Sequence, residues 1–319
     1  MKLKRGFFLN FSSFPDKAKK ARRKNKHFKN FELNKLIKLS MSKGFIGVEF
    51  PFFRFFTYSN SIKYLIRSLK ENNQRYIMDC EKSVSKKELL KLIYLSKDIG
   101  INFIRVKCSN ILSCERKNYG NEWKKKIDSI ISKIEELKPL LNKYKIKLAI
   151  ENHQDLDSKD ILYIIKIIGK KYVGVNFDVG NSFATCETPL YFFKKTKAHI
   201  INIHLKDYII LPSKRGFVLH RCPIMDGNAQ LSEILFLIKK YQIKSPISIE
   251  LGSKTPREIK IKSKIFFKSF IKDKKIKIKN SKSIMKLAEK NFTQINKIKK
   301  LISLNEINML NKSIKNLNY

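Results

Sequence analysis

Four short apolar runs in the middle of the chain each end on a side chain that can bind a metal ion. The runs are KLAIE, VGVNFD, IINIH and ISIE, and they end at Glu151, Asp178, His204 and Glu250. In a parallel β/α barrel all strands point the same way, so the residues that finish successive strands meet at one rim. One acid after a strand is usually the N-cap of the next helix, but four consecutive strand ends of this kind indicate one shared centre.

The alternation of side chains along these runs agrees with strands of a barrel. The residues two positions before the four strand ends lie on the same face as they do. These residues are small or polar: Ala149, Asn176, Asn202 and Ser248. The opposite face carries Ile, Leu, Phe or Val, which suits a core under helices.

Length and composition favour one large soluble domain. The chain has 319 residues, of which 43% are hydrophobic, enough for one barrel and an extension. No apolar run approaches the ~18 residues that span a bilayer, and the apolar stretch after the basic start is too short for a signal peptide. The five cysteines form no CxxC pair, which favours reduced thiols over disulfides or a zinc knuckle: Cys80, Cys108, Cys114, Cys186 and Cys222. We expect a cytoplasmic protein.

The net charge of +42 resembles that of nucleic-acid-binding proteins. The excess is mostly Lys, however, and it is spread along the whole chain together with abundant Ile and Asn. This distribution favours compositional drift at solvated positions over a dedicated groove, so no specific nucleic-acid partner and no membrane are expected. Attraction of an anionic substrate stays open.

Strand-like and helix-like segments alternate, which predicts an α/β fold, the (β/α)8 TIM barrel. The first strand is expected at residues 5–11, with an unusually long link through Lys17–Lys29 to the first helix. A helix over Glu88–Asp98 should end at Gly100, and one long helix is expected over Glu122–Lys143, where Ile and Leu recur at helical spacing.

The end of the chain is polar and strongly basic. Residues 1–259 are assigned to the barrel, and residues 260–319 to a basic C-terminal helical extension packed on it. Apolar residues within Ile284–Ile302 suit one face of a helix. Docking on the barrel wall is the favoured interpretation, and a membrane-surface or partner helix is the alternative.

Five sequence blocks in a fixed order, IENHQD, NFDVGN, IHLKD, CPIMDG and SIEL, resemble those of the xylose isomerase-like TIM barrels. The resemblance runs from about Gly44 to Glu250. That superfamily includes sugar isomerases and epimerases and an AP endonuclease branch. The resemblance implies that the four strand-end residues bind one divalent cation. Their oxygen and nitrogen donors suit Mn²⁺ or Mg²⁺ and tolerate Co²⁺ or Zn²⁺.

The implied reaction is isomerisation or epimerisation of a sugar or sugar acid. A metal-bound carbonyl acidifies the adjacent C–H, and an enediolate forms. By resemblance to the epimerase branch, Glu151 and Glu250 are the catalytic pair, one removing and one returning the proton.

Further residues near these strand ends are expected to bind substrate. His153 and Lys206 project from the same faces as Glu151 and His204; His153 could instead orient Glu151, and a lysine at a loop start is often solvated. Arg215 and Arg221 could grip a carboxylate or phosphate, or lie on the surface. The expected set is completed by three more residues: Glu49, Asn181 and Asp207.

Departures from the family pattern keep other functions open. Asn181 stands where many relatives carry His, and Arg221 and Met225 stand where Gly is common. ENHQD with DVGN and HLKDY resembles the branch of 3-oxo-isoapionate decarboxylase-like proteins, so a metal-dependent decarboxylase of a 3-oxo sugar acid is the alternative. A DNA-repair endonuclease ranks third, since a trinuclear zinc cluster needs more histidines than this chain offers. A barrel that only binds a ligand, and a homo-oligomer, are also compatible.

Overall fold

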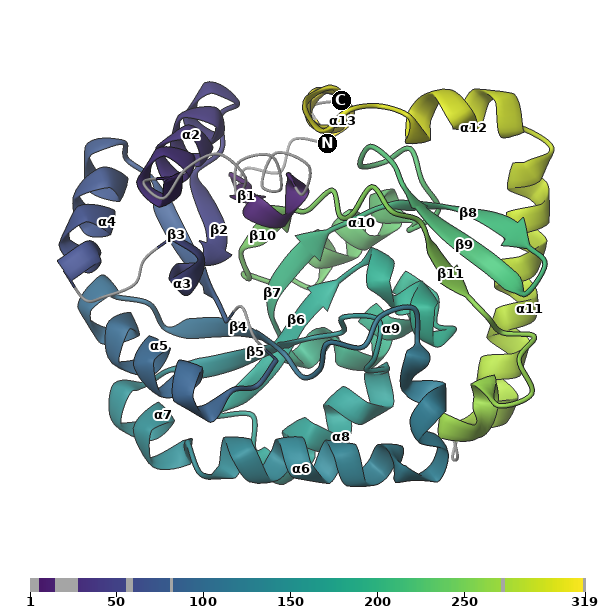
Figure 1. Ribbon diagram of the computed structural model, residues 1–319, viewed down its shortest axis with the longest axis horizontal. Coiled ribbons are helices and arrows are strands. Elements are labelled where there is room, and N and C mark those ends of the chain that lie inside the picture. The colour runs from purple at the N-terminus through teal and green to yellow at the C-terminus, as the bar shows by residue number, and fades with distance from the viewer. Residues whose placement is uncertain (1–5, 15–27, 56–59, 81–82, 271–272, 318–319) are drawn as a thin grey trace.

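The computed structural model describes the chain except for residues 1–5, 15–27, 56–59, 81–82, 271–272 and 318–319. Eight parallel strands close into a barrel in the order β1-β10-β7-β6-β5-β4-β3-β2 (Figure 1). They are β1 Phe8–Asn10, β2 Gly47–Pro51, β3 Arg75–Asp79, β4 Phe103–Lys107, β5 Lys147–Glu151, β6 Val173–Asp178, β7 Ile200–Leu205 and β10 Ile247–Ile249. The predicted barrel is confirmed.

Helices cover the outside of the barrel between successive strands (Figure 1). They are α2 Phe28–Ser42, α3 Phe52–Phe55, α4 Asn60–Glu71, α5 Lys86–Ile99, α6 Trp123–Glu135, α7 Lys138–Tyr144, α8 Ser158–Ile168, α9 Pro189–Thr196 and α10 Leu231–Lys240. Helix α5 begins and ends at residues that are typical of helix ends. Ser85 caps its first turn, and Gly100 ends it in the left-handed region at φ 74°, where glycine has no side chain to clash.

The first strand lies where it was expected but is shorter. β1 pairs in parallel with β2 and β10 and so closes the barrel. Residues 17–27 of the predicted long link lie outside the described residues.

Two of the expected helices are each divided in two. The Glu122–Lys143 segment forms α6 and α7, with Pro139 in the first turn of α7, where its missing N–H costs no helical hydrogen bond. The Ile284–Ile302 segment is divided between α11, Lys274–Phe292, and α12, Ile295–Ile302. The apolar periodicity continues across both breaks, which is why it does not reveal them.

A second, three-stranded antiparallel sheet lies beside the barrel and was not predicted. It consists of β8 Tyr208–Ser213, β9 Gly216–Arg221 and β11 Arg257–Ile259. Helix α11 runs along this sheet, and α12 and α13, Glu306–Leu317, continue around the molecule (Figure 1). Ile284, Met309 and Leu310 join the same hydrophobic core as the barrel.

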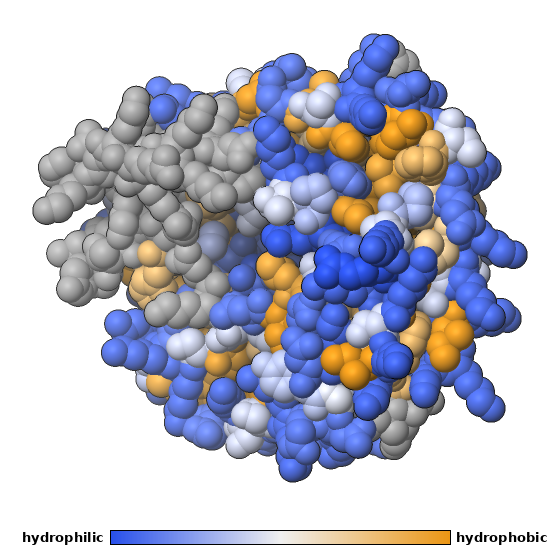
Figure 2. Space-filling model, turned by 45° about the vertical axis from the view of Figure 1, so that its right-hand side comes forward, coloured by the Kyte–Doolittle hydropathy of each residue, from blue (hydrophilic) through white to orange (hydrophobic). Residues whose placement is uncertain are grey.

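The side of the molecule that carries α11 is mostly hydrophilic, with small scattered hydrophobic patches (Figure 2). Among the described residues, no helix combines the length and the apolar character needed to cross a membrane. The buried residues of α11 are Lys277, Ser281, Ile284 and Ala288, while the other lysines of this helix are exposed.

Candidate metal centre

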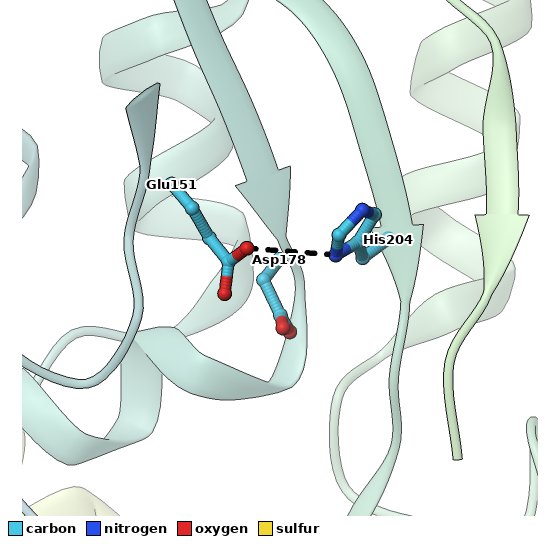
Figure 3. A group of neighbouring side chains, drawn as sticks. All are labelled: Glu151, Asp178 and His204. Atoms are coloured by element: carbon cyan, nitrogen blue, oxygen red, sulfur yellow. Dashed lines mark ion pairs between the residues drawn. The ribbon is translucent and has the colours of Figure 1, made fainter. Parts of the chain in front are cut away.

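Three of the four predicted ligands meet at one end of the barrel (Figure 3). Glu151 and Asp178 are the last residues of β5 and β6, and His204 is next to last in β7. One donor atom from each lies within 4.8 Å of the others, and all three residues are fully buried. Asp178 stands directly opposite His204 in the β6–β7 register. Parallel strands of similar length thus bring these residues together as the sequence predicts.

The fourth predicted ligand, Glu250, directly follows β10 and lies next to the same group. Its Oε2 is 2.8 Å from His204 Nδ1, and its Oε1 is 2.8 Å from Lys206 Nζ. The Glu250 side chain keeps 8% of its surface exposed, while those of Asp178 and His204 keep none. Glu250 is therefore the member of the group that a solvent-borne molecule reaches first.

The donor atoms of the group fit a hard divalent cation. Among the described residues, Glu151 Oε1 is buried without a hydrogen-bond partner, while His204 Nδ1 and Glu250 Oε2 face each other at 2.8 Å as an ion pair. Leaving a buried acceptor such as Glu151 Oε1 unsatisfied costs about 1–3 kcal/mol, and more when it is charged. Carboxylate oxygens with one imidazole nitrogen suit Mn²⁺ or Mg²⁺. Glu151, Asp178 and His204 thus form a buried candidate metal site.

Asp178 is held on one side by two neighbours. Lys206 Nζ forms an ion pair with its Oδ2, and Asn181 Nδ2 donates to the same oxygen at 2.7 Å. Burial nevertheless raises the pKa of Asp178 to about 7, because it outweighs the attraction of Lys206. The structure therefore places Asn181 and Lys206 beside a ligand, each within reach of the centre.

Two charged residues that sequence analysis missed lie below the centre. Arg105 on β4 forms an ion pair with Glu151 and lies 3.9 Å from Asp79, the last residue of β3. Burial opposes ionisation of Glu151, but Arg105 and the nearby histidines hold its pKa at about 2. The sequence contains one indication of these buried charges. Arg105 stands two positions before Lys107 in an otherwise apolar strand, so both charged side chains lie on the inner face of the barrel.

Glu49 lies deeper than a rim residue. It is the third of five residues in β2 and is fully buried. Its Oε1 is 2.7 Å from His204 Nε2, and its Oε2 accepts a hydrogen bond from Ser248. Glu49 does not end its strand, because β2 continues through Pro51.

The other residues predicted to bind substrate differ in position. His153 is half-buried, and loss of contact with water lowers its pKa to about 3 although Glu151 opposes the shift. Asp207 accepts backbone hydrogen bonds from Met225, Gly227 and Ala229, at 3.0 to 3.1 Å. It fixes the loop that follows β9, because its carboxylate links three amides of one turn.

The two arginines are separated along β9. Arg221 ends that strand, is buried, and donates to Gly252 O at 3.3 Å. A Cβ on Gly252 would lie 3.4 Å from Lys206 Cε, so Arg221 and Lys206 both lie next to this glycine. Arg215 lies in the turn at the opposite end of β9, where it pairs with Glu258. Six residues of strand, ~20 Å, keep Arg215 away from the centre.

Searches by sequence find two distant partial relatives. A 3-oxo-isoapionate decarboxylase of Pectobacterium atrosepticum is 26% identical over 91 residues, 28% of this chain and 33% of that protein. An uncharacterized protein of Methanocaldococcus jannaschii is 27% identical over 154 residues, 46% of this chain and 49% of that protein. The chain thus spans about a third of the length of the first relative and about half of the length of the second.

Solved structures share the fold over most of the chain. A xylose isomerase-like TIM barrel protein from Mycobacterium smegmatis, in complex with magnesium, has a TM-score of 0.60 and 14% identity, covering 88% of this chain and 97% of that one. A D-tagatose 3-epimerase-like protein has a TM-score of 0.53 and 16% identity, covering 90% and 100%. The model of one family matches residues 42–269. The chain belongs to the xylose isomerase-like TIM barrel family.

Proposed function

We propose that this protein is a divalent-metal-dependent isomerase or epimerase of a sugar or sugar acid. The observation that carries the proposal is the meeting of Glu151, Asp178, His204 and Glu250 with buried donor atoms turned toward one another. Mn²⁺ or Mg²⁺ held by these four residues would polarise a substrate carbonyl and favour an enediolate beside it.

The surroundings of each carboxylate suggest how the chain's own residues act. Glu250 is the partly accessible acid, and Lys206 and His204 lie against it. We assign it the transfer of a proton at the substrate carbon, because a proton carrier must reach that carbon directly. Glu151 is fully buried against Arg105 and is less accessible to a substrate carbon than Glu250. Despite burial, neighbouring cations lower the pKa of both acids, Arg105 that of Glu151 and Lys206 that of Glu250, so accessibility separates their roles. Glu151 therefore suits metal binding better than proton transfer, although we keep Glu151 and Glu250 together as the catalytic pair.

Decarboxylation of a 3-oxo sugar acid is the second candidate. Two buried cations, Arg221 and Lys206, both lie next to Gly252, and Lys206 also pairs with Glu250. Cations at that point could hold a substrate carboxylate. The partial relative named as a 3-oxo-isoapionate decarboxylase agrees with an anionic substrate. Loss of CO₂ from a β-keto acid passes through an enediolate of the same kind.

Incubation in D₂O tests both candidates. The Mn²⁺-loaded protein would be mixed with a panel of ketoses and 3-oxo sugar acids and followed by NMR, with a metal-free control. Deuterium next to a carbonyl, with the carbon skeleton kept, supports the isomerase or epimerase. Deuterium with loss of a carboxyl carbon supports the decarboxylase, and no exchange contradicts both for that panel.

Two variants separate catalysis from simple binding. Glu250→Gln should slow any turnover by about 10²-fold to 10⁴-fold, the usual contribution of a positioned acid–base group. Glu233→Gln on the exposed face of α10 is the matched control and should keep full turnover. A protein that only binds its ligand would show no turnover in the wild type or in either variant.

A further inference from the structure

Glu49 is a buried carboxylate inside the barrel, and no role in the reaction proposed above requires it. Its side chain contacts residues from two other strands. Oε1 lies 2.7 Å from His204 Nε2 and accepts from Asn202 Nδ2 at 3.3 Å, while Oε2 accepts from Ser248 Oγ. A carboxylate without exposure has a large desolvation cost, so these contacts must fix it in place. The attraction of His204 keeps the pKa of Glu49 below its usual value despite burial.

The imidazole of His204 lies between Glu49 and the candidate metal centre. Nε2 faces Glu49, while Nδ1 faces the opposite way, 2.8 Å from Glu250 Oε2 and 3.8 Å from Glu151 Oε2. Nδ1 thus faces the carboxylates of the candidate metal centre. The two ring nitrogens therefore face different groups. Nε2 faces the carboxylate of Glu49 in the barrel interior, and Nδ1 faces the candidate metal centre.

We propose that Glu49 is a positioning residue that makes Nδ1 the metal-binding atom of His204. By accepting the Nε2–H it holds the ring in the tautomer whose Nδ1 lone pair faces the cation. Histidine ligands commonly donate their second N–H to a carboxylate, and loss of that partner weakens metal binding about 10-fold to 100-fold. This inference rests on the proposed function of the four-residue centre. It also replaces the substrate-binding role expected of Glu49, because the imidazole of His204 lies between Glu49 and the centre at which a substrate would bind.

The test measures Mn²⁺ affinity by calorimetry and the state of the His204 ring by ¹⁵N NMR, with Mg²⁺ in place of paramagnetic Mn²⁺. Glu49→Ala should weaken Mn²⁺ binding about 10-fold to 100-fold. Glu49→Gln keeps an oxygen acceptor of the same length, so its loss should be smaller. Asp155→Asn changes another fully buried carboxylate, which bonds Ser109 and Leu156, and serves as the control with unchanged affinity.

The NMR measurement needs no variant, so it remains decisive if Glu49→Ala fails to fold. In the wild-type protein with Mg²⁺, Nε2 of His204 should be protonated and Nδ1 should not. The opposite pattern, or equal Mn²⁺ affinity in the wild type and both Glu49 variants, overturns the positioning role alone. A wild-type protein that binds no Mn²⁺ overturns the proposed metal-dependent function together with this inference.

Discussion

Replacement of Lys277 by Met should destabilise the whole molecule. Lys277 lies on α11 with 1% of its side chain exposed, and its Nζ is 3.0 Å from both Asp157 Oδ2 and Glu187 Oε1. Asp157 caps α8 in the segment after Glu151, and Glu187 bonds Ser158. One ammonium therefore joins the C-terminal extension to the segments that follow two strands of the candidate centre.

The magnitude follows from what the substitution leaves behind. Met fills much of the same volume but leaves two buried carboxylates without their shared cation, and breaking a buried pair in this way costs about 3–5 kcal/mol. Glu187, whose pKa burial already raises, can take up a proton and limit the loss to the lower part of that range. Over 319 residues the unfolding entropy is about 0.7 kcal/mol per kelvin, so a loss of about 3–4 kcal/mol should lower Tm by about 4–6 °C.

Thermal unfolding followed by circular dichroism measures this shift. Lys279→Met, an exposed position two residues further along α11, is the matched control and should change stability by less than about 0.5 kcal/mol. Lys277 holds the pKa of Asp157 well below its usual range despite burial. That stabilisation is present above the pKa of the unfolded carboxyl and is lost as pH falls, so the difference between wild type and Lys277→Met should shrink in acid. Equal Tm values for the two variants, or a difference that grows in acid, would refute the reasoning.

Three further outcomes are expected. Mn²⁺ affinity should rise as pH increases through about 7 and should go on rising above it, because both Asp178 and His204 must lose a proton to bind the cation. Burial raises the pKa of Asp178 to about 7, and the charges of Glu49 and Glu250 raise the pKa of His204 well above its usual value despite burial; calorimetry on both sides of pH 7 checks this, and a flat profile contradicts it. Lys206→Met should bind Mn²⁺ about tenfold more tightly or better, because a charge that repels the cation is removed, and unchanged or weaker binding would count against it. The five cysteines are buried, so a thiol reagent should label none in the native protein and all five in denaturant; rapid native labelling would be inconsistent with the structure.

The barrel could be predicted from the sequence because its strands carry their own signal. Runs such as VGVNFD are apolar, short and separated by helical periodicity, and each of these features is local. The antiparallel sheet beside the barrel has a weaker signal, since β8 and β9 contain the apolar runs YIIL and GFVL but β11 contains none. β8 contains Pro212, and β9 pairs with β11 about forty residues further along the chain, in a segment that is mostly polar. A strand of three residues such as Arg257–Ile259 is defined by its partner and not by its own composition.

The residues of the candidate centre could be predicted wherever the ends of their strands could be predicted. The four predicted ligands come together because each lies at or next to the carboxyl end of its strand. Glu49 and Arg105 lie one layer deeper, and their depth depends on where β2 and β4 end, which sequence patterns define least well. The separation of Arg215 from Arg221 depends on a hairpin that was itself not predicted.

The charges inside the barrel end give a separate reason to expect a divalent cation. The inward-facing ionisable residues of this layer, apart from the histidines, are the carboxylates Glu49, Asp79, Glu151, Asp178 and Glu250 and the cations Arg105, Lys107 and Lys206. Burial raises the pKa of Asp79 well above its usual value and that of Asp178 to about 7, and a divalent cation bound in this layer would favour the ionised carboxylates. With the imidazole neutral, as a metal ligand must be, five carboxylates then face three cationic side chains.

The carboxylates thus outnumber the cationic side chains in a mostly buried region, inside a chain whose net charge is +42. Uncompensated buried charge costs several kcal/mol per ion. One divalent cation offsets this excess of negative charge more fully than a monovalent cation does. The same balance predicts that Glu151→Gln, which removes one carboxylate charge, should weaken binding of Mn²⁺ far more than it weakens binding of a monovalent ion such as Na⁺.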